Sequence, residues 1–302
     1  MAKRSIASGS VTCRGTTGDD CDLLKVGEGL VYAADSTSSF FDNTAGQSRL
    51  AQSFHHARKL IQLEDYPIGI MTFGLGSIGA RNLESLVAEF ENGLIPLAAR
   101  PAGDVYTVEA IATDLKDFLA AKYDAEFPIP APAPAPDGGA APPDPRPQMG
   151  VIMGGYSRGQ FFADEFVIGF PGGTVTRTRD NTAADVGALW WGVTTPIMRL
   201  VLGFDPDLHQ WFLDKEVDPA EVGNILSELR GRMQWNILFD GMPLQDAIDF
   251  GVYLANVTIG HSRFVVGPPV CGGHVDVATI THRGFSWVRQ KKNIVKGDSV
   301  FF

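Results

Sequence analysis

The sequence predicts an α+β fold in which antiparallel sheets are stacked and covered by helices. Two observations favour this class. Strand-like runs come in neighbouring pairs joined by turn residues, as in hairpins, over 23–35, 59–74, 150–170 and 274–290. Between these pairs lie segments whose apolar residues recur at helical spacing, so strands and helices occupy separate stretches of the chain. Such segregation is typical of antiparallel sheets packed against helices.

In the first half of the chain we expect a hairpin formed by Leu23–Val26 and Gly29–Asp35, with a turn at the intervening Gly and Glu. A second strand pair is expected over 59–74, where a Pro-containing turn separates two apolar runs. Helices are expected over Ser77–Phe90 and Val105–Tyr123, because each gathers its apolar residues on one face.

A proline- and alanine-rich stretch, residues 128–147, interrupts the chain. Proline lacks a backbone donor and favours extended polyproline conformation, so this stretch is predicted to join neither a helix nor a sheet. The stretch follows a predicted helix and precedes a predicted strand pair over 150–170. That order is compatible with an inserted loop in one continuous domain.

In the second half, helices are expected over Pro219–Trp235 and Leu244–Val257. They are followed by two strands, HVDVATIT and FSWVRQ, around a turn that contains His282. The segment from Thr174 to Leu213 is interpreted as an insert relative to the family that the chain resembles, which is named below.

Composition excludes several classes of protein. There are 25 Lys and Arg against 35 Asp and Glu, a net charge of −10, which disfavours binding to nucleic acid or to an anionic membrane. The three cysteines are too few for a disulfide framework. No apolar run reaches the roughly 18 residues of a membrane span, and the N-terminus lacks the apolar core of a secretory signal. We therefore expect a cytoplasmic protein.

Two short motifs suggest other chemistry. Gly74–Gly79 matches G-x-G-x-x-G after a predicted strand, a pattern of phosphate-binding turns, although no acidic residue ends a following parallel strand as a dinucleotide site requires. We favour a tight strand-to-helix connection there and keep a nucleotide-dependent enzyme as an alternative. His55 and His56 have no further ligand at metal-binding spacing. The sequence thus predicts neither a cofactor nor a metal.

Several runs in register resemble the proteasome β-subunit superfamily of N-terminal-nucleophile (Ntn) hydrolases, which includes bacterial proteasome-like ring proteins. The runs that carry the resemblance are Leu30–Ser36, Lys59–Leu63, Pro67–Gly74, Pro243–Ile248, Cys271–Ile280 and Gly284–Val288. The resemblance covers most of the chain. It implies one proteasome-like domain over 1–302, folded as a four-layer αββα sandwich, with 1–15 as a propeptide or N-terminal extension.

In active members of that superfamily an N-terminal threonine, freed by autoprocessing, hydrolyses peptide bonds. Its hydroxyl attacks and its own α-amine is the general base, while a Lys lowers the pKa of the amine and an Asp orients the Lys. By this resemblance Thr16, released by cleavage at Gly15-Thr16, is the nucleophile, Lys59 the activator and Asp35 the orienting residue. The resemblance also implies a homo-oligomeric ring, a peptide or unfolded-protein substrate, and a separate ATPase as a candidate partner.

The chain departs from the family at two places. Thr16 lies farther from Asp35 than the family's nucleophile does, and the GDDCD that follows is unusually acidic for the start of a buried strand. Pro268 and Cys271 stand where active relatives have an Asp and a Ser. The alternative hypothesis is therefore a catalytically inactive structural or assembly subunit that keeps the fold.

Overall fold

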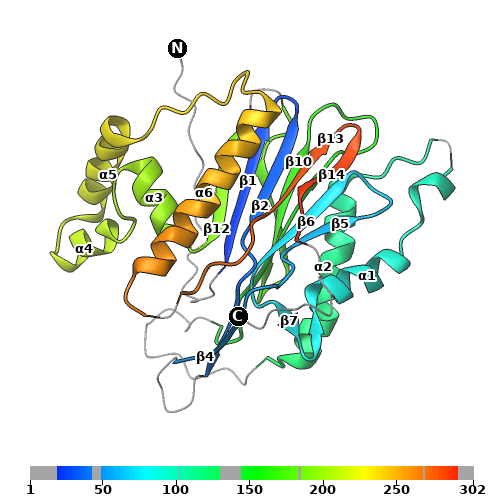
Figure 1. Cartoon of the computed structure of the whole chain (residues 1–302), viewed down its shortest axis with the longest axis horizontal. Coiled ribbons are helices and arrows are strands. Elements are labelled where there is room, and N and C mark those ends of the chain that lie inside the picture. Colours follow the sequence, from blue (N-terminus) through cyan, green and yellow to red (C-terminus); the bar gives the residue numbers. More distant parts are fainter. Residues whose placement is uncertain are drawn as a thin grey trace, which may run out of the picture.

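The structure is a computed structural model that describes residues 19–42, 49–101, 103–129, 144–182, 185–267 and 269–291. These residues form two five-stranded sheets, two small strand pairs and a set of helices (Figure 1). Neighbouring strands in both large sheets run antiparallel. The architecture is mixed α/β with antiparallel sheets, which is compatible with the predicted α+β class.

The first sheet has the order β12-β1-β2-β13-β14. Its strands are β12 (Gly187–Gly192), β1 (Asp20–Val26), β2 (Gly29–Ala34), β13 (Asp276–Thr281) and β14 (Gly284–Arg289). Because side chains alternate along a strand, β1 presents two different faces. Cys21 and Leu23 point toward the second sheet, whereas Leu24 and Val26 belong to the core beneath the helices.

The second sheet has the order β11-β10-β9-β6-β5. Its strands are β11 (Thr174–Arg179), β10 (Asp164–Phe170), β9 (Met149–Gly155), β6 (Ile68–Gly74) and β5 (Leu60–Leu63). Two short pairs lie beside the large sheets, β3 (Ser38–Asp42) with β4 (Arg49–Phe54) and β7 (Ser77–Ile78) with β8 (Arg81–Asn82). The strands of the second sheet come from both sides of the proline-rich stretch.

One apolar core lies between the two large sheets. Leu23 and Tyr32 of the first sheet pack there with Met71 and Ile152 of the second, and all four are fully buried. Each fully buried side chain of this size stabilises the fold by roughly 1.5–3 kcal/mol relative to leaving it in water. The sheets are therefore held face to face by hydrophobic burial.

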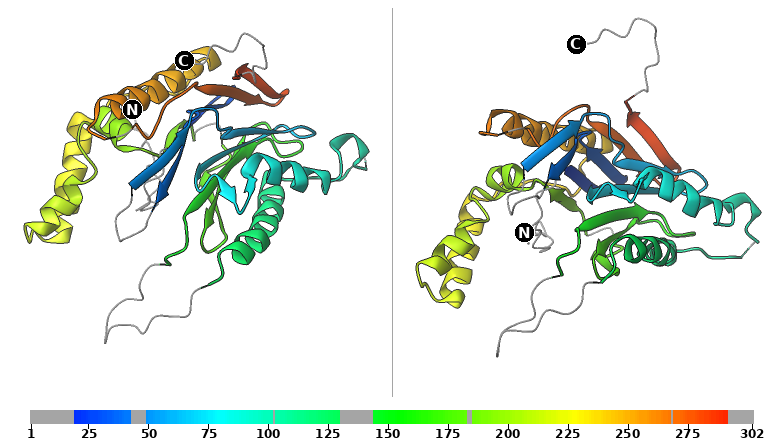
Figure 2. Two further views of the ribbon diagram at one scale, coloured as in Figure 1. Left: turned by 60° about the horizontal axis from the view of Figure 1, so that its bottom comes forward. Right: turned by 90° about the horizontal axis from the view of Figure 1, so that it is seen from below.

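Helices cover the outer sides of the sheets (Figure 2). The second sheet packs against α1 (Leu83–Asn92) and α2 (Val108–Glu126), and the first against α3 (Thr195–Leu202) and α6 (Leu244–Phe264). A further pair, α4 (Leu208–Asp214) and α5 (Pro219–Met233), contact each other, and Val222 is the one residue of α5 that is buried. A 3-10 turn, η2, spans Leu97–Ala99. None of the described helices combines the length and apolar character of a membrane span.

The helix predicted to begin at Ser77 begins only at Leu83, so that prediction is wrong. Ser77–Ile78 instead pairs with Arg81–Asn82 across a turn in which Gly79 has a φ of +59°. The side chain of Asn82 then accepts a hydrogen bond from the backbone N–H of Ser85 and caps the helix. The capping asparagine fixes the start, although the apolar periodicity already appears at Ile78.

Other boundaries also differ from the prediction. β1 begins at Asp20 and not at Leu23, because Asp20 already pairs with Gly192 of β12 and Cys21 with Ala34 of β2. The segment interpreted as an insert contains β11, β12, α3 and α4. The proline-rich stretch lies largely outside the described residues; its flanks, α2 and β9, pack against each other.

Gly150 provides a test of the packing between β9 and β6. A Cβ at this position would lie 2.0 Å from Cζ of Phe73, which is opposite it in the neighbouring strand. We expect Gly150→Ala to lower the free energy of unfolding by about 1–3 kcal/mol, as measured by urea denaturation. Gly27→Ala is the control, because nothing lies within 4 Å of a Cβ there. Equal effects of the two substitutions would contradict this packing.

Candidate functional site

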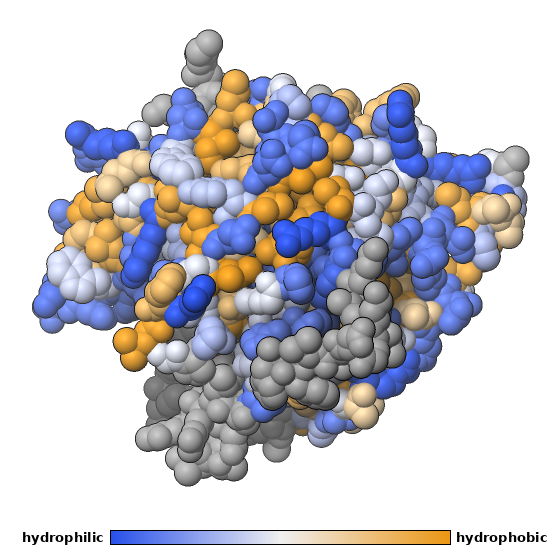
Figure 3. All heavy atoms as spheres, in the orientation of Figure 1, coloured by the Kyte–Doolittle hydropathy of each residue, from blue (hydrophilic) through white to orange (hydrophobic). Residues whose placement is uncertain are grey.

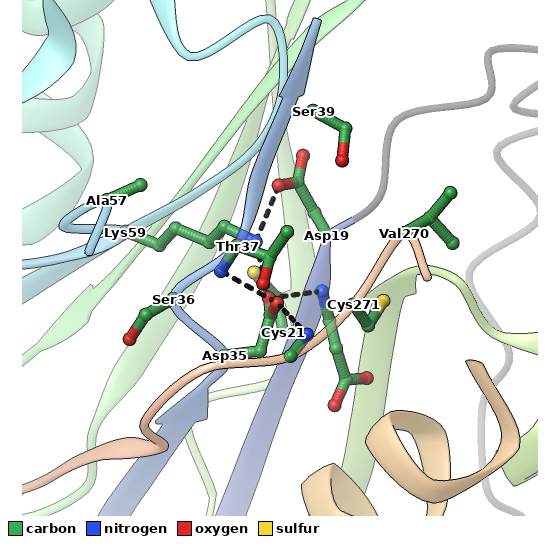
Figure 4. A network of polar contacts seen from close by, with 12 residues as sticks. Asp19, Cys21, Asp35, Ser36, Thr37, Ser39, Ala57, Lys59, Val270 and Cys271 are labelled. Carbon is green, nitrogen blue, oxygen red and sulfur yellow. Dashed lines mark hydrogen bonds and ion pairs between the residues drawn. The ribbon is translucent and has the colours of Figure 1, made fainter. Parts of the chain in front are cut away.

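The candidate site lies where the two large sheets approach each other at the ends of β1, β2 and β5 (Figure 4). Asp19 precedes β1, Asp35 follows β2 and Lys59 precedes β5. Because β1 and β2 are antiparallel neighbours, the start of β1 and the end of β2 fall at the same edge. Lys59 comes from the second sheet. The three side chains therefore bring the two sheets together at this edge.

The ammonium of Lys59 is held by two carboxylates. Its Nζ lies 2.7 Å from Oδ1 of Asp19 and also donates to Oδ1 of Asp35. The side chain of Lys59 is 5% exposed, that of Asp19 is 9% exposed and that of Asp35 is fully buried. Burial by itself would lower the pKa of Lys59, but the two carboxylates outweigh it and raise that pKa above its usual value. Lys59 is thus a fixed positive charge and not a base.

The carboxylate of Asp35 is held on both oxygens. Oδ1 accepts from the backbone N–H of Asp20 at 3.0 Å as well as from Lys59. Oδ2 accepts from the backbone N–H groups of Thr37 and Gly272, each at 3.0 Å. These donors come from separate segments of the chain, so Asp35 also organises the loop before β13. Charge-assisted bonds of this kind are stronger than neutral ones.

Asp19 is equally well fixed. Its Oδ2 accepts from the backbone N–H of Gly74 at 2.6 Å, and its carbonyl accepts from Val193 at 2.7 Å. The backbone of Gly192 passes so close that a Cβ would lie 2.1 Å from the Asp19 carbonyl oxygen. Gly192 also has a φ of +87°, so glycine is needed there for both reasons. Both the carboxylate and the backbone carbonyl of Asp19 are therefore held in place at the site.

The structure brings together two of the three predicted site residues. Asp35 and Lys59 are in direct contact, whereas Thr16 lies outside the described residues. Sequence reasoning missed Asp19. The acidic run that begins at Asp19 is visible in the sequence, but carboxylates next to a buried strand argue against burial and do not by themselves indicate a partner for Lys59.

Two cysteines lie within the site. Cys21 donates through Sγ to the carbonyl of Thr72 at 3.2 Å, and Cys271 lies beside the Asp35-bound Gly272. Burial raises the pKa of both thiols well above the usual range. Burial therefore favours the neutral thiol over the thiolate at both positions.

Histidines lie at the exposed rim of the site. Oγ1 of buried Thr37 is 3.1 Å from Nδ1 of His55, and the rings of His56 and His274 are 6.3 Å apart, edge to face. Across the described part of the chain, no three His, Cys, Asp or Glu residues gather so as to hold a metal ion.

The glycine motif at 74–79 leads into the β7–β8 pair, not into a helix. The Gly74 N–H donates to Asp19 and the Leu75 N–H donates to the carbonyl of Gln148 at 2.9 Å. Neither amide is left for a phosphate, and no helix N-terminus follows directly to complete such a site. The motif forms the connection that follows β6, and its first residue, Gly74, holds the carboxylate of Asp19.

Two further carboxyl groups lie on the opposite face of β1. Asp20 and Asp22 share that face with Leu24 and are fully buried, and within the described residues no hydrogen bond reaches any of their carboxyl oxygens. Burial raises the pKa of both groups well above its usual value, and repulsion between them raises that of Asp20 further. The neutral acids are therefore favoured in the folded protein.

No family model matches the chain, and no curated protein matches it. Among solved structures it is similar to Anbu (ancestral beta-subunit) from Yersinia bercovieri, with a TM-score of 0.47 and 15% identity over 89% of this chain and 87% of that chain. It is also similar to an Anbu (Gly-1) mutant from Hyphomicrobium sp. strain MC1, with a TM-score of 0.48 and 14% identity over 90% and 86%. Identity this low leaves the chemistry of the site to be judged from its own residues.

Asp22 gives a prediction for the pH dependence of stability. A carboxyl with a higher pKa in the folded than in the unfolded chain binds more protons when folded, so the free energy of unfolding falls as pH rises above about 3.9. The fall continues up to the folded-state pKa, with a slope of up to about 1.4 kcal/mol per pH unit for each carboxyl. We expect Asp22→Asn to flatten this fall in urea denaturation over a pH series. Exposed Asp240→Asn is the control, and equal slopes in the two variants would contradict the account.

Proposed function

We propose that this chain is a proteasome-like subunit that keeps the Ntn-hydrolase scaffold as part of an assembly and does not hydrolyse peptides. The proposal includes the four-layer αββα sandwich, with α1 and α2 in one outer layer and α3 and α6 in the other. The observation that carries it is the contact between the carboxylate of Asp19 and the ammonium of Lys59.

The charge of the cluster is unfavourable for the expected chemistry. The family mechanism needs a lysine whose positive charge lowers the pKa of a neighbouring α-amine, so that the amine can act as a base. Here Lys59 is flanked by the carboxylates of Asp19 and Asp35, which leaves one net negative charge on the three groups. A negative neighbour stabilises an ammonium and raises its pKa. An amine beside this cluster would stay protonated at neutral pH.

A second candidate function is a threonine peptidase formed by cleavage at Gly15-Thr16. In it Thr16 would be nucleophile and base, Lys59 the activator and Asp35 the orienting residue. The direct Lys59–Asp35 contact favours this candidate. It requires Asp19 to leave Lys59 once the chain has been cleaved.

Intact-mass spectrometry of the protein from its native cells separates the two candidates. The non-catalytic subunit is expected to persist as a species that still carries residues 1–15. The peptidase is expected as a species that begins at Thr16. If the species that begins at Thr16 predominates, the primary proposal is wrong.

Peptide hydrolysis provides a second test. We expect no turnover of fluorogenic peptides by the purified protein. If turnover is found, the second candidate predicts that Lys59→Ala abolishes it, whereas substitution of the half-buried Lys122, on α2, leaves it unchanged. Turnover that survives Lys59→Ala would contradict both candidates.

We also propose that the chain forms a homo-oligomeric ring, as the resemblance implies. Apolar side chains gather along α6 and beside the α4–α5 pair (Figure 3). Trp211 and Leu238, in this region, are 53% and 75% exposed, and exposed apolar side chains that gather in a patch are typical of interaction surfaces. Sedimentation is expected to give a species several times heavier than 32.5 kDa. A sole species at the monomer mass would contradict the ring.

A further inference from the structure

A second buried lysine lies behind the site. Lys291 follows β14, and its Nζ donates to Oδ2 of Asp276 at 2.7 Å, to Oγ of Ser36 at 2.9 Å and to the carbonyl of Ala57. Its backbone N–H donates to Oδ1 of Asp276 at 2.8 Å. The side chains of Lys291 and Asp276 are each 3% exposed. All three ammonium hydrogens therefore have acceptors, which is what burial of such a charge requires.

The acceptors of Lys291 adjoin the site on both sides. Ser36 directly follows Asp35, and Ala57 lies two residues before Lys59. Hydrogen bonds link the same segments, since Ala57 N–H donates to the Ser36 carbonyl at 2.9 Å and Ser36 N–H donates to the Gly272 carbonyl at 3.0 Å. Lys291 thus contacts the segment that carries Asp35 and the segment that carries Lys59.

The hydroxyl of Ser36 completes the arrangement. It accepts from Lys291 and donates to the carbonyl of His274, so its orientation is fixed from both sides. Ser36 is fully buried. Buried polar groups are normally hydrogen-bonded, and this hydroxyl both accepts and donates a hydrogen bond.

We infer that Lys291 is a positioning residue for the Asp35–Lys59 site, because it ties the Asp35 segment and the Lys59 segment to the start of β13. The inference deepens the proposed function, since it concerns the same site. Without the ammonium, Asp276 would be a buried unpaired carboxylate, and Ser36 and the Ala57 carbonyl would each lose a donor. The segment from Asp35 to Thr37 would then lose its link through Lys291 to Asp276 and Ala57, and would keep its bonds to Lys59, Gly272 and His274.

Two native groups can report on this loosening. Cys271 is 2% exposed and lies beside Gly272, which binds both Asp35 and Ser36, so its alkylation by iodoacetamide measures local opening. Acetylation of Lys59 at alkaline pH measures its pKa, because only the neutral amine reacts. Both modifications are read by peptide mass on the intact, full-length protein.

Lys291→Met is expected to raise the alkylation rate of Cys271 by about tenfold or more, a change typical of easier local opening. The same variant is also expected to speed acetylation of Lys59, because the pKa of Lys59 falls when Asp35 is held less firmly. Lys291→Arg is expected to restore most of the protection. The matched control is Lys25→Met, because Lys25 is also buried but donates to the carbonyl of Asp180 at 2.8 Å, at the far end of β1.

Ser36→Ala tests the inference if Lys291→Met does not fold. This variant removes the contact with Lys291 and leaves no unpaired charge, and it is expected to shift both labelling rates in the same direction. Labelling of Cys271 and Lys59 that is unchanged in Ser36→Ala, or that rises equally in Lys291→Met and Lys25→Met, would overturn the inference. These rates do not depend on N-terminal cleavage or peptide turnover, so a failure here is distinguishable from a failure of the proposed function.

Discussion

The ammonium of Lys59, buried between the carboxylates of Asp19 and Asp35, is the interaction on which this end of the molecule depends. Removing such a charge from water costs several kcal/mol, and only closely placed opposite charges offset it. The cluster draws one residue from the second sheet and two from the first. The hydrophobic core brings the two sheets together, and the ion cluster fixes how their ends meet.

In the proposed function, the same interaction limits how the site can act. A lysine can activate a neighbouring amine only while its positive charge is not neutralised. Here the negative charges of two carboxylates outweigh the single positive charge of Lys59. Burial favours the neutral thiol at both cysteines, and the two aspartates on the other face of β1 favour their protonated forms. What remains is a rigid polar centre reinforced by Lys291 from behind. Such a centre is suited to holding a scaffold in one shape.

Asp35 and Lys59 were predicted through the resemblance of the runs Leu30–Ser36 and Lys59–Leu63 to the proteasome β-subunit superfamily. The sequence did not predict Asp19, since carboxylates before and within a buried strand contradict the usual preference for exposure. The predicted start of the helix at Ser77 was wrong, because the apolar pattern does not reveal that Asn82 caps the helix and that it begins at Leu83. β11, with the sequence TVTRTR, was missed because it is half exposed and lacks an apolar run. Local patterns locate strand ends, whereas pairing across the sheets depends on tertiary contacts.

A double-mutant cycle between Asp19 and Lys59 tests the central claim most directly. The free energy of unfolding would be measured for Asp19→Asn, Lys59→Met and the double variant by urea denaturation. The account predicts a coupling energy of about 1–3 kcal/mol, as found for residues in one buried ion network. A coupling energy within about 0.5 kcal/mol of zero, the range of independent sites, would show that Asp19 does not hold Lys59 and would contradict the account.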